Sequence, residues 1–159
     1  MSDSHGKTNL VRQAMETLRL AGAEAFVHCG DIGSLDVLDE FADQPLWFVW
    51  GNMDFELPSW KSYVEQLNLP WPESPVEFQA DGKRLAVFHG HEERFGQALQ
   101  KAPYDYLLHG HTHRPDDYRI QNMRVINPGA LCRVRTKTVA LLDPARDIVE
   151  FISLDGQQR

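Results

Sequence analysis

The segment LWFVWGNMD, residues 46–54, runs from a dense apolar stretch into a short polar loop. Its first five residues, Leu46 to Trp50, are all apolar, which is typical of a strand buried on both faces. The loop Gly51-Asn52-Met53-Asp54 then brings an amide and a carboxylate to the end of that strand. The segment therefore predicts a buried strand with polar side chains at its carboxyl end.

Helix and strand patterns alternate on the amino-terminal side of this segment. Apolar residues recur at helical spacing from Thr8 to Leu20, and Gly22 follows as a stop signal. A short apolar strand is expected from Ala25 to His28, and Ser34 is expected to cap a second helix, which Pro45 ends. Such alternation of helices and buried strands indicates the α/β class.

The carboxyl-terminal side consists of an irregular segment followed by a strand-rich half. Residues Phe55 to Pro75 contain four prolines and two tryptophans, so we expect them to be irregular or half helical. Asp81-Gly82 predicts a hairpin turn, and Glu92 to Lys101 predicts a helix. The expected strands are Val76–Phe78, Arg84–Phe88, Tyr106–Leu108, Tyr118–Ile120, Arg124–Ile126, Thr138–Leu142 and Ile148–Leu154. No repeat or linker separates these segments, so residues 1–159 are predicted to form one domain.

The composition argues against a nucleic-acid or membrane protein. A hydrophobic fraction of 42% and a charged fraction of 25% are ordinary for a globular chain. The net charge of -7 disfavours DNA or RNA as a partner, because nonspecific binding to phosphates needs Lys and Arg. No apolar run is long enough for a signal peptide or a membrane span. Cys29 and Cys132 are expected to be reduced thiols, so we expect a cytoplasmic protein.

Five short motifs, each joining a potential metal ligand to a glycine, stand at the ends of these strands. They are Asp3-Ser4-His5-Gly6, Gly30-Asp31, Gly51-Asn52-Met53-Asp54, His89-Gly90-His91 and Gly110-His111-Thr112-His113. Glycine lets the backbone turn sharply, which suits a ligand held in a tight loop. Imidazoles mixed with carboxylates favour Mn, Fe, Ni, Co or Zn over Ca. Each motif is weak alone, but their order and completeness predict a metal site.

The order of these motifs resembles that of the calcineurin-like metallophosphoesterase superfamily, and in particular of its small single-domain bacterial and archaeal phosphodiesterases. The resemblance extends through Asn127-Pro128-Gly129, a turn typical of that subfamily. It implies a four-layer α-β-β-α sandwich and a small phosphoester substrate. It also implies two divalent metal ions at the strand ends, with Mn expected first and Ni, Fe, Co, Zn or Mg as alternatives.

The resemblance implies a role for each motif residue. The ligands implied for a first metal are Asp3, His5 and His113, and those for a second metal are Asn52, His89 and His111. Asp31 matches the carboxylate that bridges both ions, which can hold them about 3.5–4 Å apart. A water or hydroxide between the ions is then the nucleophile. Asp54 matches a carboxylate behind the ligands that orients a ligand or this water, so catalysis is assigned to Asn52, Asp54 and Asp31.

Two departures from the family pattern change these expectations. Larger superfamily members have His where this chain has Met53, and that imidazole is thought to protonate the leaving group. A thioether donates no proton, so leaving groups of low pKa are expected to react faster; the small phosphodiesterases share this feature. The family also has a strand of about six residues before its first ligand, whereas only Met1 and Ser2 precede Asp3. Either the sequence starts late, as from a misassigned start codon, or the protein lacks most of the first strand. In the chain as given, Asp3 and His5 are expected to be loosely held.

Several other residues allow two interpretations. His91 and Arg114 are candidate substrate-binding residues, with a solvated surface position as the alternative. His28 and His109 are expected to be buried, hydrogen-bonded imidazoles rather than ligands. The aromatic side chains near the site loops either cover an edge of the core or stack on an aromatic leaving group; they are Phe55, Trp60 and Trp71.

A metal-dependent phosphodiesterase, a hydrolase, is thus the leading hypothesis. The alternative is a non-catalytic scaffold of the same fold, comparable to the retromer subunit of eukaryotes; the filled ligand positions favour the enzyme. A nuclease of the same superfamily is less well supported, because the chain is short and acidic. The natural substrate, the metal and a possible homo-oligomer stay open.

Overall fold

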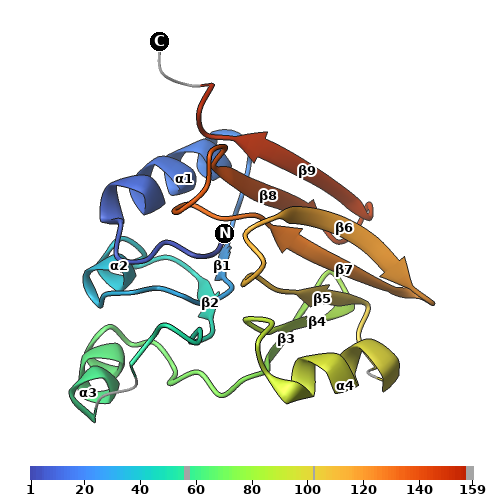
Figure 1. Ribbon diagram of the computed structural model, residues 1–159, viewed down its shortest axis with the longest axis horizontal. Helices are drawn as coiled ribbons and strands as arrows, with labels where there is room; N and C mark the ends of the chain where they lie inside the picture. Colours follow the sequence, from blue (N-terminus) through green and yellow to red (C-terminus); the bar gives the residue numbers. More distant parts are fainter. Residues whose placement is uncertain (56–57, 102, 157–159) are drawn as a thin grey trace.

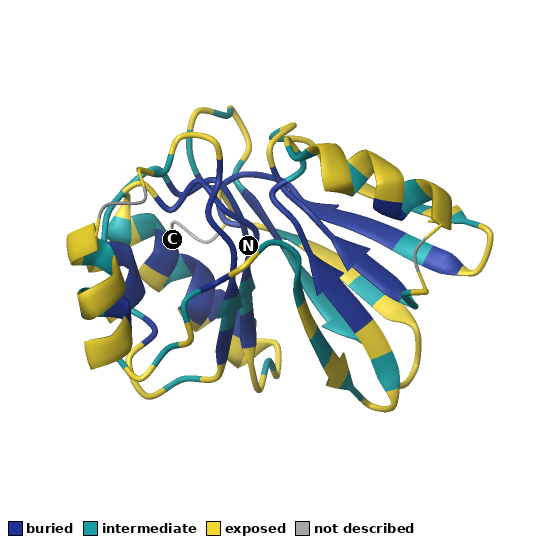
Figure 2. Ribbon diagram, turned by 90° about the horizontal axis from the view of Figure 1, so that it is seen from below, coloured by how far each residue is buried: buried dark blue, intermediate teal, exposed yellow. Residues whose placement is uncertain are grey.

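The structure, a computed structural model, describes residues 1–55, 58–101 and 103–156. Two layers of β-structure face each other, and helices cover the outer side of each layer (Figure 1, Figure 2). The helices are α1 (Thr8–Leu20), α2 (Asp36–Asp39) and α3 (Pro58–Gln66) on one side and α4 (Glu93–Lys101) on the other. The α/β class and the predicted layer order α-β-β-α are confirmed.

The layer beside α1 contains the parallel strands β1 (Phe26–His28) and β2 (Leu46–Phe48), in which Phe26 pairs with Leu46. Strand β2 ends before the predicted Trp50, because the chain already turns there into the polar loop. The predicted cap was wrong: the residue before α2 is Leu35, and no side-chain capping bond forms. The antiparallel hairpin of β8 (Thr138–Asp143) and β9 (Ile148–Ser153) lies beside this layer.

The second layer is a five-stranded sheet of order β3-β4-β5-β7-β6. Its strands are β3 (Val76–Ala80), β4 (Lys83–Val87), β5 (Tyr106–Leu108), β6 (Pro115–Ile120) and β7 (Met123–Pro128). Strands β4, β5 and β7 are parallel, so the loops after β4 and β5 leave the same edge of the sheet. Those loops carry the histidine motifs. Trp47 stacks on Phe78 with ring centroids 4.1 Å apart and joins the two layers.

The first residues of the chain are buried and bonded on two sides. The N–H of Cys29 donates to the carbonyl of Met1 at 3.0 Å, and the N–H of Leu131 donates to the carbonyl of Ser2 at 3.1 Å. Asp3 is fully buried. The expectation that Asp3 is loosely held was therefore wrong, because pairing with two distant segments replaces the support of a long strand.

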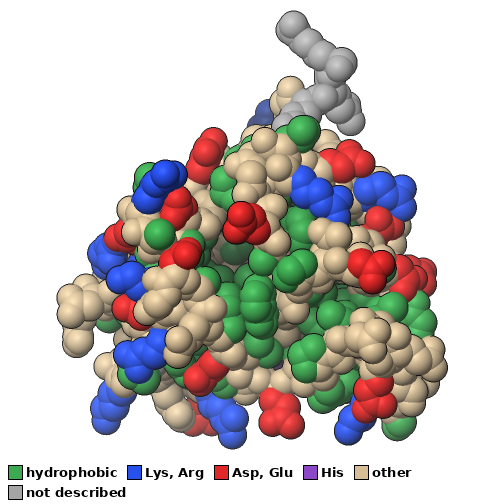
Figure 3. Space-filling view, turned by 180° about the vertical axis from the view of Figure 1, so that it is seen from behind, with side chains coloured by type: hydrophobic (Ala, Val, Ile, Leu, Met, Phe, Trp, Pro, Cys, Tyr) green, Lys and Arg blue, Asp and Glu red, His purple; other side chains and the backbone are tan. Residues whose placement is uncertain are grey.

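A groove of about 770 Å³ extends from Met1 between β1 and β8. Figure 3 shows hydrophobic side chains gathered around a hollow on this side of the molecule. The Met1 ammonium donates to the carbonyl of Val27 at 2.9 Å at one end of the groove. Neighbouring residues in a parallel strand bond alternately to opposite sides, so Val27 faces the groove while Phe26 and His28 bond toward β2.

Candidate metal centre

The polar loops at the strand ends share an unusual backbone conformation. Asp3, His5, Asp31, His111 and His113 all have positive φ angles, between 45° and 68°. This region costs a residue with a side chain roughly 1–3 kcal/mol, and such strain gathers at functional sites. Glycine serves a different purpose at Gly51, where an added Cβ would lie 2.1 Å from Asp31 Oδ1. The loops are thus shaped to bring polar side chains together.

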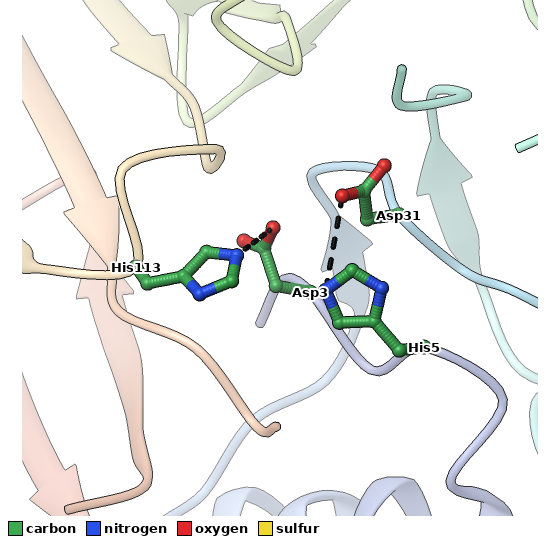
Figure 4. Close-up of side chains that lie close together, drawn as sticks. All are labelled: Asp3, His5, Asp31 and His113. Atoms are coloured by element: carbon green, nitrogen blue, oxygen red, sulfur yellow. Dashed lines mark ion pairs between the residues drawn. The ribbon is translucent and has the colours of Figure 1, made fainter. Parts of the chain in front are cut away.

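The first ligand group consists of Asp3, His5, Asp31 and His113, and Figure 4 shows these side chains facing one another. Each offers one ligand atom, and these atoms all lie within 4.8 Å of one another. Asp3 Oδ1 is 3.1 Å from His113 Nε2, and His5 Nε2 is 3.8 Å from Asp31 Oδ2. Asp3 Oδ1 and His5 Nε2 are buried without a hydrogen-bond partner among the described residues. Such atoms are costly unless something binds them, so this donor set fits a metal ion.

The second ligand group consists of Asn52, His89 and His111. Asn52 Oδ1 lies 3.0 Å from His89 Nε2 and 3.0 Å from His111 Nδ1. The other ring nitrogen of His89, Nδ1, is 2.7 Å from the carbonyl oxygen of Cys29 and donates to it. That bond leaves a lone pair on Nε2, as is usual for metal-binding histidines whose other ring N–H donates to a carbonyl group.

Asp31 lies between the two ligand groups. Its Oδ2 faces His5, while its Oδ1 is 3.5 Å from His89 Nε2 and accepts the N–H of Met53 at 2.9 Å. The side chain is only 4% exposed. One buried carboxylate therefore contacts both groups, which is the position that a bridging ligand needs.

Electrostatics favour the metal-binding form of two ligand imidazoles, those of His5 and His111. Burial lowers the pKa of His5, and the nearby Arg133 guanidinium lowers it further. Burial, and then the neighbouring His89, lower the pKa of His111. A neutral imidazole is the form that binds a metal, so neither residue needs to lose a proton at neutral pH.

Asp54 holds two of the ligand loops by their backbone. Its carboxylate accepts the N–H groups of Ile32 at 3.0 Å, Gly33 at 2.7 Å and Gly51 at 2.8 Å. Burial raises its pKa. These bonds join the loop after Asp31 to the loop before Asn52.

The other predicted residues lie at or behind the site. The His91 ring centroid is 5.4 Å from that of His89, and both His91 and Arg114 are exposed. His28 bonds through Nε2 to the Ser4 hydroxyl at 2.9 Å, and His109 bonds to a backbone carbonyl, so both are buried, hydrogen-bonded imidazoles as predicted. Trp60 and Trp71 each lie 5.3 Å from Trp50 and cover the core, whereas Phe55 is 73% exposed.

Sequence reasoning missed two residues that shape the histidine loops. Asn127 Nδ2 donates to the carbonyl of Gly110 at 2.8 Å and to the Thr112 hydroxyl at 3.0 Å, bracing the loop that carries His111. Glu92 accepts the backbone N–H groups next to its own helix, including that of His89. The signal for Glu92 was a carboxylate placed directly after the His-Gly-His motif.

Residues 1–147 match the calcineurin-like phosphoesterase superfamily domain. The chain belongs to this superfamily. It is 30% identical over 163 residues to a phosphodiesterase of Methanocaldococcus jannaschii, covering 98% of this chain and 97% of that protein. It is 28% identical over 142 residues to a probable metallophosphoesterase of Methanothermobacter thermautotrophicus, covering 85% of this chain and 72% of that one. The resemblance seen in the motifs is confirmed.

Solved structures agree with this assignment. An archaeal phosphodiesterase superposes with a TM-score of 0.85 at 27% identity, covering 96% of each chain. The phosphoesterase YfcE of E. coli gives a TM-score of 0.72 at 22% identity, covering 99% of this chain and 92% of that one. Vps29 of Entamoeba histolytica, solved with Zn²⁺, gives 0.62 at 14% identity, covering 89% and 88%. The last two likenesses show the fold alone, so the scaffold alternative gains only weak support.

Proposed function

We propose that this phosphoesterase is a metal-dependent phosphodiesterase that holds two divalent cations across Asp31. The observation that carries the proposal is the position of this carboxylate, with one oxygen toward each ligand group. The residues that would hold the ions are Asp3, His5 and His113 on one side and Asn52, His89 and His111 on the other. When bound, the ions would supply Lewis acidity toward the phosphoryl oxygens and lower the pKa of a water. The protein itself would hold the ligand atoms in place, because they project from loops with positive φ angles and Asp54 bonds to the backbone behind those loops.

The thioether of Met53 defines the proposed substrate class. Met53 is 45% exposed beside the site, and its thioether supplies no proton to a departing alkoxide. The exposed Phe55 ring follows in the same loop and offers a face on which an aromatic leaving group can stack. Small phosphodiesters with a leaving group of low pKa are therefore the proposed substrates.

Cationic and imidazole groups at the rim would meet the substrate phosphate. His91 and Arg114 keep the roles proposed from the sequence. Arg133 joins them, because the N–H of Cys132 donates to the Asp3 carbonyl at 3.1 Å and thereby brings the next residue to the first ligand group.

The ligand atoms are imidazole nitrogens and side-chain oxygens, which suit Mn²⁺. Burial raises the pKa of Cys29 to about 12, so its thiol stays protonated.

The test is hydrolysis of a chromogenic phosphodiester with added Mn²⁺, with and without EDTA. We expect activity with Mn²⁺, its loss in EDTA, and its loss in Asp31→Asn. The matched control is Asp81→Asn, because Asp81 has the same positive φ in a hairpin turn away from the site. Full activity of the Asp31→Asn protein, or of the wild type in EDTA, would contradict the proposal.

The non-catalytic scaffold is the second candidate, and inactivity with every divalent ion would favour it. No helix in the described part of the chain is long and apolar enough to cross a membrane. We also propose that residues 1–159 act as one domain in the cytoplasm, since Cys29 and Cys132 are both free thiols.

A further inference from the structure

A carboxylate outside both ligand groups is bonded directly to a ligand loop. Glu92 Oε1 accepts the N–H of His89 at 2.9 Å, and Oε2 accepts the N–H of Gly90 at 2.6 Å. Oε1 also accepts the hydroxyl of Ser74 at 2.7 Å. The side chain is 15% exposed, so all of these bonds lie largely away from solvent.

An ordinary helix cap does not account for this arrangement. Glu92 directly precedes α4, and a capping side chain bonds to amides inside the first turn of the helix that follows it. This carboxylate bonds instead to amides that precede it in the chain. No Lys or Arg within the described ranges pairs with it; His91 Nδ1, at 3.7 Å from Oε2, is the nearest group that can carry a positive charge.

A half-buried carboxylate without a basic partner costs free energy unless hydrogen bonds replace its lost hydration. Hydrogen bonds from the N–H groups of His89 and Gly90 and from the Ser74 hydroxyl offset that cost, because they stabilise the negative charge of the carboxylate. That charge lies behind the loop of the second ligand group, where it favours a cation. The same bonds fix the backbone from which the His89 ring projects.

We propose that Glu92 is a positioning residue for the second metal ion, which holds the His89 loop and ties it to the segment that contains Ser74. Asp54 holds the loops of Asp31 and Asn52 by the same device, with three backbone amides on one carboxylate. Glu92 thus holds a ligand loop of the second β-layer by its backbone N–H groups, as Asp54 holds two loops of the first. The inference rests on the proposed two-metal function.

The first variant is Glu92→Gln, which keeps the shape of the side chain. It removes the charge and sets an amide NH₂ against at least one backbone N–H, so one clamp bond is lost. The matched control is Glu93→Gln, the neighbouring carboxylate, which is exposed on the first turn of α4. Mn²⁺ binding is measured by calorimetry on the metal-free full chain, and a thermal melt in EDTA confirms that each variant is folded.

We expect the wild type and Glu93→Gln to bind two ions. We expect Glu92→Gln to bind one ion with unchanged affinity and the other roughly 10- to 100-fold more weakly, the range seen when an outer-shell partner is lost. Ser74→Ala, which removes one bond and keeps the charge, should weaken the same ion by a smaller factor and serves if Glu92→Gln does not fold. A merely structural role would lower both affinities or only the melting temperature.

The inference is overturned if the wild type binds two ions and Glu92→Gln matches Glu93→Gln in both affinities. It is also overturned if Glu92→Gln weakens both ions equally. If the wild type binds no ion at all, the proposed function itself fails, which separates the two outcomes.

Discussion

The first ligand group is held by backbone hydrogen bonds, whereas the second is held by side-chain carboxylates. Asp3 sits on a segment that pairs with Cys29 and Gly30 on one side and with residues 131–132 on the other. His89 and Asn52 sit on loops clamped by Glu92 and Asp54. The first group also borders an open groove at Met1. The first group thus depends on pairing between backbone segments, and the second on carboxylates that accept backbone N–H groups.

The largest expected effect distinguishes the ligands of one ion from Asp31, the proposed ligand of both ions. His111→Ala and His89→Ala should each remove one ion, that of the second group, and lower activity by at least about 100-fold. Asp31→Asn should weaken both ions, because its oxygens face both groups. Metal content per chain and the turnover of a chromogenic diester measure this. Full activity of either His variant with saturating metal would contradict the ligand assignment.

Met53 tests the chemistry on the side of the second group. Because the Met53 thioether donates no proton to the leaving group, the rate of hydrolysis should fall steeply as the pKa of the leaving group rises. Met53→His should reduce that dependence, since general acid catalysis contributes about 10²–10⁴-fold. A series of aryl and alkyl phosphodiesters gives the slope, and a flat slope in the wild type would argue against this account.

Replacing Arg133 or Arg114, the two arginines proposed to contact the substrate, should have smaller and unequal effects on KM. Arg133→Ala is expected to raise KM about 10-fold with little change in kcat, because its charge reaches His5 in the first ligand group. Arg114→Ala should have a smaller effect, since the pKa of His5 responds to Arg133. Steady-state kinetics on the same diester compare the two. Equal effects would leave the two arginines indistinguishable and contradict the preference for Arg133.

Filling the groove should strengthen the first group selectively. An added apolar segment of about six residues before Met1 can pair with the free edge of β1 and cover the apolar lining. We expect about 2 kcal/mol of stabilisation, which is about 5 °C in Tm for a chain of this size, together with tighter binding of the first ion. A Gly/Ser extension of equal length is the control, and equal Tm values for the two extensions would contradict the expectation.

Low pH should lower the free energy of unfolding through His28, which lies beneath the first ligand group. Burial, with the nearby N-terminal ammonium, holds the pKa of His28 well below its ordinary value of 6.5. Below pH 6.5 the unfolded chain therefore takes up a proton that the native state does not, so the free energy of unfolding falls by up to about 1.4 kcal/mol per pH unit. Metal-free melts from pH 7.5 to 5.0 should show a shallower loss for His28→Asn. Identical slopes would rule out this role for His28.

Local pattern was enough to predict the parts of the site that depend on short segments. The apolar run at residues 46–50, the glycines beside the ligands and the spacing of His111 and His113 predicted that polar loops follow the strands. The structure has a strand before the loops of Asp31, Asn52, His89, His111 and His113. Long-range pairing was not visible. Nothing around Leu131 indicates that its N–H bonds to Ser2, and this pairing is why the amino-terminal ligands are firmly held. The position of Glu92 after the His-Gly-His motif was a signal, but the sequence did not show that its carboxylate accepts the N–H of His89.

The most direct test of the central claim is an electron paramagnetic resonance titration of the metal-free protein with Mn²⁺. Two ions that share Asp31 at roughly 3.5–4 Å must be magnetically coupled. The account predicts two Mn²⁺ per chain, with a coupled spectrum that disappears in Asp31→Asn and persists in Asp81→Asn. A single bound ion, or two ions with uncoupled spectra, would contradict it.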